Sequence, residues 1–212
     1  MTPAPHLIFD LDGTLSDPAV GIGRSINYAL AAFDHLPIAD SEISRLIGPP
    51  LDQGFLSILG AATPAHLVEL VAKFRERYGA VGYAENTLYA GIPEALQQLA
   101  AANIPLGVCT SKRADFAERI LAMFGLRPLF DFVDGGDVGI SKAQQLAALR
   151  AAGTISAKSI MIGDRAVDVA AARANGLGAV GVLWGHGTRQ ELLAAQPDRL
   201  LTSPSELTTL LP

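Results

Sequence analysis

The stretch that decides the fold reads LIFDLDGTL and occupies residues 7–15. It begins with three apolar residues, the pattern of a short strand that is buried on both faces. Two carboxylates separated by one residue, Asp10 and Asp12, follow at once, and Gly13 stands where the backbone must turn. In a parallel α/β sheet, ligands bind beyond the carboxyl ends of the strands. The two aspartates therefore lie where a functional site is expected, although Asp12-Gly13 is also a common turn pair.

Short apolar runs of the same kind recur after residue 100. They predict further strands at residues 106–109, 130–133, 159–162 and 179–183, with a weaker one near Leu200. Helical patterns separate them, with ends expected at Gly125 and Gly153 and a start at Ser141. Alternating strands and helices predict an α/β protein with a doubly wound, Rossmann-like parallel sheet.

One long stretch after the first strand contains helical patterns and no convincing strand. The helix starts expected there are Asp17-Pro18 and Thr63-Pro64, and a break is expected at Gly48-Pro49-Pro50. We therefore predict an α/β catalytic core of residues 1–16 and 84–212 and an inserted, all-helical cap of residues 17–83.

Composition limits the classes of function. Of the 212 residues, 50% are hydrophobic and 17% are charged, which is typical of a compact globular protein. The formal net charge of −5 and the lack of a Lys/Arg cluster argue against binding to a nucleic acid polymer. Neither a signal peptide nor an apolar run of about 18 residues is apparent, so we expect a cytoplasmic protein without a membrane span. The single cysteine, Cys109, excludes an internal disulfide framework.

Polar side chains also follow other strands or begin the next helix. They are Thr110, Ser111 and Lys112 after the second strand, Lys142 after the third, and Asp164 and Asp168 after the fourth. Each has an ordinary structural explanation, because hydroxyls and carboxylates cap helices and lysines are usually solvated. Their coincidence at one edge of the sheet favours a site at that edge, which we expect to face solvent.

This set of side chains suits phosphoryl transfer. Carboxylates bind Mg²⁺ together with water and substrate phosphate, and a carboxylate can attack phosphorus to form an acyl phosphate. A lysine and hydroxyls can hold the equatorial phosphoryl oxygens, where positioning and electrostatics carry most of the catalysis. No serine lies in a Gly-x-Ser-x-Gly elbow, so a serine hydrolase is not indicated.

The order of these motifs resembles that of the haloacid dehalogenase superfamily over nearly the whole chain. Residues 10–15, Thr110, Lys142 and the pair Asp164 and Asp168 carry this resemblance. A helical cap inserted after the first strand is similar to the group that contains phosphoglycolate phosphatases and bacterial 5′-nucleotidase-like phosphatases. The strings closest to the latter branch are IGPPL at 47–51, ENTLYAGI at 85–92, MIGDR at 161–165 and GVLWG at 181–185. Many members of that branch carry an arginine shortly before the lysine, and this chain has none between Asp134 and Lys142.

The resemblance implies a role for each carboxylate. Asp10 would be the nucleophile and a Mg²⁺ ligand. Asp12 would be the general acid and then the general base, with its backbone carbonyl on the metal. Asp164 would be the remaining carboxylate ligand, and Asp168 would support the metal site.

The resemblance also implies how substrate is held. Thr110 and Lys142 would bind the phosphoryl group, helped by Ser111. Substrate choice is expected to depend on the cap, where the candidate contacts are Gly48, Arg24 and Arg75. His186 stands where relatives commonly have an aromatic residue, and a solvated loop histidine is favoured there over a residue at the pocket edge.

The function expected from these motifs is hydrolysis of a small phosphate monoester, such as a nucleoside 5′-monophosphate or phosphoglycolate. A phosphosugar mutase of the β-phosphoglucomutase kind shares the core motifs and is the alternative. A phospho-acceptor signalling domain also has a doubly wound sheet with an aspartate pocket. That domain would require neither the helical insertion nor Asp12, so it is the most remote alternative.

Overall fold

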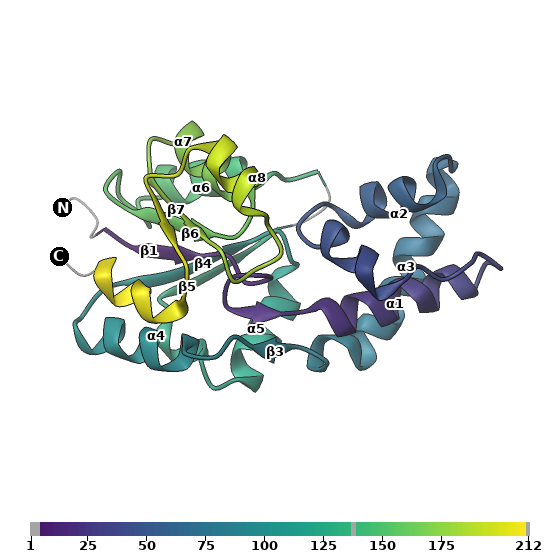
Figure 1. The fold of residues 1–212 in the computed structure, drawn as a ribbon, viewed down its shortest axis with the longest axis horizontal. Coiled ribbons are helices and arrows are strands. Elements are labelled where there is room, and N and C mark those ends of the chain that lie inside the picture. Colours follow the sequence, from purple (N-terminus) through teal and green to yellow (C-terminus); the bar gives the residue numbers. More distant parts are fainter. Residues whose placement is uncertain (1–4, 137–138, 211–212) are drawn as a thin grey trace. The chain divides into compact units, whose positions relative to one another are not determined.

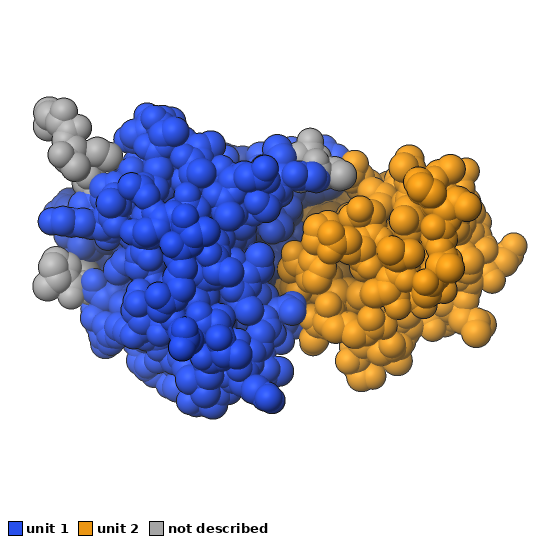
Figure 2. Space-filling view, turned by 90° about the horizontal axis from the view of Figure 1, so that it is seen from above, with its two compact units in different colours: residues 1–17, 88–212 blue, residues 18–87 orange. Residues whose placement is uncertain are grey.

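A computed structural model describes residues 5–136 and 139–210 of the chain. Contacts between residues divide the chain into two compact units, which Figure 2 shows in different colours. Residues 1–17 and 88–212 form an α/β unit, and residues 18–87 form a helical unit.

Within the described residues, the α/β unit contains a six-stranded sheet in the order β5-β4-β1-β6-β7-β8 (Figure 1). The strands are β1 (Leu7–Phe9), β4 (Leu106–Thr110), β5 (Phe132–Gly135), β6 (Ile160–Gly163), β7 (Gly178–Val182) and β8 (Arg199–Leu201). All neighbouring pairs are parallel. This arrangement confirms the predicted parallel α/β sheet. Because the chain order reverses on either side of β1, the end of β1 is the switch point where such sheets bind ligands.

The strand register brings the polar strand ends together. Phe9, the last residue of β1, is paired with Val108 of β4 and Ile162 of β6. All three of these apolar residues are fully buried. The residues that follow the three strands consequently meet at one edge of the sheet.

Five α-helices of this unit cover the sheet. They are α4 (Ile92–Ala101), α5 (Ala114–Met123), α6 (Lys142–Ala151), α7 (Ala166–Ala174) and α8 (Arg189–Ala195), all within the described residues. Figure 1 shows α6, α7 and α8 on one face of the sheet and α4 and α5 on the other. As predicted, Ser141 caps α6, where its hydroxyl accepts a hydrogen bond from the Gln144 N–H. The sequence predicts β5 two residues too early, because Arg127–Leu129 forms a 3₁₀ turn (η3) before the strand.

The helical unit has its own core. Its elements are α1 (Ala19–Ala31), the 3₁₀ helix η1 (Asp40–Leu46), α2 (Leu51–Leu59), α3 (Pro64–Ala80) and the 3₁₀ helix η2 (Gly82–Ala84). Helix α1 packs on α3. The buried apolar residues of these two helices are Ile22, Ile26, Ala29, Leu30, Leu70, Phe74 and Tyr78. The spacing of these residues explains why both segments are helical and amphipathic.

Two predicted helix starts have different outcomes. Thr63 caps α3 as predicted, since its hydroxyl accepts a hydrogen bond from the His66 N–H and Pro64 is the first helical residue. The prediction that Asp17 caps α1 is wrong. Asp17 belongs to β2 (Ser16–Asp17), which forms a two-stranded sheet with β3 (Thr87–Leu88), and its carboxylate contacts His186 instead.

No single helix in the described part of the chain has the length and apolar character to cross a membrane. Helices α2 and α3 reach that length and composition only as a pair, and they meet at a bend of 115°.

Candidate active site

Asp10 is the first residue after β1, and its carboxylate lies beside the ammonium group of Lys142. The Asp10 N–H donates to the Ile162 carbonyl of β6 at 2.9 Å, which fixes the backbone at the end of the strand. The Leu11 N–H donates to Asp10 Oδ1 at 2.8 Å. Lys142 Nζ lies 2.8 Å from Asp10 Oδ2. Both ionic side chains are buried, so Lys142 is not a solvated lysine.

Asp168 lies on the other side of Lys142. Lys142 Nζ donates to Asp168 Oδ1, so one ammonium group bridges two carboxylates. Asp168 Oδ2 accepts the Arg165 N–H at 3.0 Å, which ties the carboxylate to the first turn of α7. The site thus joins the ends of two strands to the starts of two helices.

Asp164, directly after β6, is enclosed by segments that are distant in the sequence. Its Oδ1 accepts the Thr14 hydroxyl at 3.3 Å, and its Oδ2 accepts the His186 N–H at 2.8 Å. Gly13 has a φ of +82°, and a Cβ there would collide with the Asp164 carboxylate. A Cβ on Gly185 would collide with the same side chain. Glycine at both positions therefore allows the two loops to close around Asp164.

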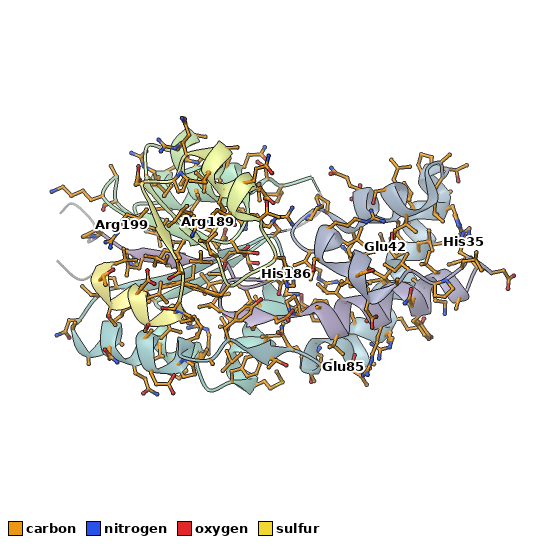
Figure 3. The ribbon with its side chains drawn as sticks, viewed as in Figure 1. His35, Glu42, Glu85, His186, Arg189 and Arg199 are labelled. Atoms are coloured by element: carbon orange, nitrogen blue, oxygen red, sulfur yellow. The ribbon has the colours of Figure 1, made fainter. Side chains whose placement is uncertain are left out.

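His186 also links this loop to Asp17. Its side chain is only 8% exposed, and Nε2 lies 3.1 Å from Asp17 Oδ1. Figure 3 labels it in the loop that follows β7. The interpretation of His186 as a solvated loop histidine is wrong. Its backbone N–H donates to Asp164, and its ring contacts Asp17.

The expectation that these carboxylates face solvent is also wrong. Asp10 is 5% exposed, Asp164 0% and Asp168 1%. The loops that follow β1 and β7 close over Asp164, and the sequence gives no direct sign of that packing.

Among the described residues, these three carboxylates form the group that could hold a metal ion. One ligand oxygen of each lies within 4.8 Å of the other two. Three carboxylates against one ammonium leave two negative charges unbalanced when all are ionised. A divalent cation would neutralise that excess, and a donor set made only of oxygen suits Mg²⁺.

The pKa values show the same charge excess. Burial, followed by repulsion from Asp168 and Asp10, raises the pKa of Asp164 to about 7. Burial also raises the pKa of Asp168, although Lys142 opposes that shift. Burial disfavours the charged form of Lys142, yet the charges of Asp10 and Asp168 raise its pKa above the ordinary lysine value. Without a further cation, Asp164, Asp168 and Lys142 all release their protons at higher pH than usual.

The end of β4 places Thr110 at the same edge. Thr110 is buried, and its hydroxyl accepts the Lys112 N–H at 3.2 Å. Its carbonyl accepts the side-chain amide of Gln145 at 3.2 Å. Ser111 is exposed. Helix α5 begins after Arg113, so neither hydroxyl is its N-cap.

Asp12 forms an ion pair that was not predicted from the sequence. Lys112 Nζ lies 2.9 Å from Asp12 Oδ2, and the two side chains are 8% and 14% exposed. Burial raises the pKa of Asp12, against the lowering effect of Lys112. The sequence does show a lysine, Lys112, directly after Thr110 and Ser111 at the end of a strand. Nothing in the neighbouring sequence identifies Asp12 as the partner of that lysine.

The residues predicted to contact substrate from the cap all lie in the helical unit. Gly48 has a φ of +104° between η1 and α2. On α1, the side chain of Arg24 is 63% exposed, and its Nη1 lies 2.7 Å from Oε1 of Glu85. Figure 3 labels Glu85. Arg75 is a partly buried residue of α3. Their contact with substrate stays a prediction.

Comparison with known proteins identifies the family. A family model described as haloacid dehalogenase-like hydrolase matches residues 7–182. The chain therefore belongs to this family, as its motifs predict. The departure between Asp134 and Lys142 falls partly on residues 137 and 138, which lie outside the described part of the chain.

Two of the similar proteins within this family are phosphatases. A 5′-nucleotidase of Pseudomonas aeruginosa is 38% identical over 200 residues, which cover 91% of this chain and 89% of that protein. A phosphoglycolate phosphatase of Cereibacter sphaeroides is 36% identical over 82% of each chain. The tyrosine-protein kinase PtkA of Mycobacterium tuberculosis is 36% identical over 87% of this chain but only 64% of its own length.

Solved structures agree with the fold. The crystal structure of a predicted phosphatase from Clostridium acetobutylicum has a TM-score of 0.90 at 32% identity, with 98% of this chain and 97% of that one covered. The predicted fold class is thus confirmed. The predicted enzyme class, a phosphoric monoester hydrolase, is confirmed by the family and its phosphatase relatives.

Proposed function

We propose that the protein hydrolyses a small-molecule phosphate monoester through an aspartyl phosphate on Asp10, with Mg²⁺ as its cofactor. The cluster of buried carboxylates around Lys142 at the end of β1 is the main support. The names of the relatives suggest a nucleoside 5′-monophosphate or phosphoglycolate as substrate.

Asp10 would act as the nucleophile. Its two oxygens are oriented by the Leu11 N–H and by Lys142, so the carboxylate is held in one position before substrate arrives. In the first half-reaction, an Asp10 oxygen bonds to phosphorus and the alcohol oxygen leaves. In the second, water bonds to phosphorus and the Asp10 carboxylate is released.

Asp12 would move the protons. It would give one to the leaving alcohol in the first half-reaction and take one from water in the second. Its raised pKa favours the protonated form that the first step requires. Thr110, Ser111 and Lys142 would bind the phosphoryl oxygens.

Mg²⁺ would be held by Asp10, Asp164 and the backbone carbonyl of Asp12, with Asp168 supporting the site. The all-oxygen donor set, the short mutual distances and the raised pKa of Asp164 fit a divalent cation. When bound, the cation supplies positive charge between the carboxylates and the substrate phosphate.

The helical unit would select the substrate. Its separate core supports an independent body, and we extend the prediction that residues 17–83 act as a cap over a core of 1–16 and 84–212. Within that unit, the candidate contacts remain Gly48, Arg24 and Arg75. The proposal also keeps the expected cytoplasmic location.

The test is phosphate release from a broad panel of phosphorylated metabolites. Release should stop with a chelator, return with Mg²⁺, and be absent from Asp10→Asn. Full turnover in metal-free buffer would contradict the metal assignment. Phosphate transfer that depends on an added sugar bisphosphate, without accumulation of inorganic phosphate, would favour the mutase.

A further inference from the structure

The Asp12 carboxylate is held by one oxygen only. Lys112 Nζ lies 2.9 Å from Oδ2. Oδ1 is buried and accepts no hydrogen bond from any described residue. No described residue therefore competes for Oδ1, which is available to exchange a proton with substrate or water.

The position of Lys112 is fixed by its backbone. Its N–H donates to the Thr110 hydroxyl at 3.2 Å, and its carbonyl accepts the Gly136 N–H at 2.9 Å. The chain is thus held on both sides of the residue, and the lysine stem starts from a defined point. The ammonium group reaches Asp12 along a side chain that is 8% exposed.

This pair differs from a surface ion pair. In the helical unit, the side chains of Lys73 and Glu76 are 39% and 54% exposed, and both partners are accessible to water. The Lys112 and Asp12 side chains are 8% and 14% exposed. A lysine usually keeps its ammonium group in water, and burying its long side chain costs rotamer entropy. The buried position of Lys112 is therefore unusual for a lysine.

We propose that Lys112 is the positioning residue for Asp12 and that it gives the two carboxylate oxygens different tasks. The inference rests on the proposed function, since it concerns its two proton transfers. Lys112 holds Oδ2, and Oδ1 carries the proton. In the first half-reaction, the proton on Oδ1 passes to the alcohol oxygen as the P–O bond breaks. In the second, Oδ1 takes a proton from water as the water oxygen bonds to phosphorus, while Lys112 keeps its own protons.

The test compares two esters in the Mg²⁺-loaded enzyme. An alkyl phosphate has a leaving group that needs a proton, whereas p-nitrophenyl phosphate has one that needs little. Rapid mixing gives the rate of alcohol release in the first turnover for the wild type, Lys112→Met and Lys112→Arg. Arg113→Met is the matched control, because it removes a cation from the next residue, whose partner is the exposed Asp115.

Lys112→Met should slow release from the alkyl ester by about 10- to 100-fold, part of the about 10²- to 10⁴-fold typical of general acid–base catalysis. Release from the p-nitrophenyl ester should fall much less. Lys112→Arg should restore part of the rate, and Arg113→Met should leave the ratio of the two esters unchanged. An equal fall with both esters, or a change confined to KM, would overturn the assignment.

A double variant covers the case in which Lys112→Met also perturbs folding. If Lys112 acts through Asp12, Lys112→Met should slow the reaction no further once Asp12 is already Asn. An undiminished effect in the Asp12→Asn background would contradict the inference. The alkyl ester is one that the wild type hydrolyses in the metabolite panel, and a wild type that releases phosphate from no ester of that panel would overturn the proposed function and this inference with it. An active wild type with an unchanged ester ratio in Lys112→Met would overturn the inference alone.

Discussion

The edge of the α/β sheet and the helical unit place their charged residues in opposite ways. At the sheet edge, the ionic side chains of Asp10, Asp168 and Lys142 are at most 7% exposed. In the helical unit, Arg24 pairs with Glu85 and Lys73 with Glu76 on accessible surfaces. Exposed pairs contribute little to stability and cost little, whereas buried charges carry a large desolvation penalty. The sheet edge thus retains an arrangement that folding alone does not favour, which is the expected property of a functional site.

The largest difference should appear when one lysine is removed from each region. Lys142→Met leaves Asp10 and Asp168 buried without their shared cation, which should lower the free energy of unfolding by about 3–5 kcal/mol. Phosphate release should also fall below detection, because the phosphoryl group loses a cation. Lys73→Met, the control in the helical unit, should alter neither property. Urea unfolding and phosphate release measure both, and equal effects of the two variants would contradict the comparison.

A second contrast uses two glycines with positive φ. Gly60, between α2 and α3, has a φ of +73° and no atom within 4 Å of an added Cβ. Gly60→Ala should therefore cost only the backbone strain of about 1–3 kcal/mol. Gly13→Ala, at a φ of +82°, adds a collision with the Asp164 carboxylate. It should lower the thermal midpoint further and reduce phosphatase activity strongly, while Gly60→Ala keeps activity. If the two variants matched in both assays, the packing of Gly13 on Asp164 would have no functional importance.

A third prediction concerns the pH dependence of stability in metal-free protein. The pKa of Asp164 is about 7 in the folded protein, against about 3.9 in an unfolded chain. The folded state therefore binds this proton more tightly, and the resulting stability is complete below about pH 4 and is lost as the pH rises through about 7. Asp168 shifts in the same direction.

Mg²⁺ should reverse this trend, because it binds the ionised carboxylates. Thermal midpoints with a chelator should fall from pH 5 to pH 8, whereas the increase caused by Mg²⁺ should be greater at pH 8 than at pH 6. Asp164→Asn is the control, and it should reduce the slope of the metal-free profile to the part that Asp168 contributes. Parallel pH profiles with and without Mg²⁺ would argue against a cation at these carboxylates.

The sequence was sufficient to predict the sheet and the motifs because both depend on local patterns. Buried apolar runs such as residues 7–9 mark the strands, and Thr63-Pro64 marks a helix start. Asp17-Pro18 carries a similar local pattern, but a contact with His186, far along the chain, overrides it. Local patterns are thus reliable only where no distant partner competes.

The burial of the site could not be predicted in the same way. Asp164 is covered by the Thr14 hydroxyl and by the loop that contains His186, both distant in the sequence. Lys112 pairs with Asp12 across about one hundred residues, so no motif spacing reveals it. Such contacts depend on strand order and register, which are properties of the whole fold and cannot be read from a local segment of sequence.

Mapping the phosphoryl group shows whether Asp10 forms the covalent intermediate. The enzyme is mixed with substrate, quenched in acid and digested, and the peptides are analysed by mass spectrometry. With p-nitrophenyl phosphate, whose leaving group needs little protonation, the intermediate should still form in Asp12→Asn. This variant should then accumulate more phosphorylated protein than the wild type, because loss of the base slows hydrolysis of the intermediate. A phosphoryl group is expected on Asp10 in that variant, and none is expected in Asp10→Asn. A phosphoryl group on another residue, or near-normal turnover by Asp10→Asn, would contradict this role of Asp10.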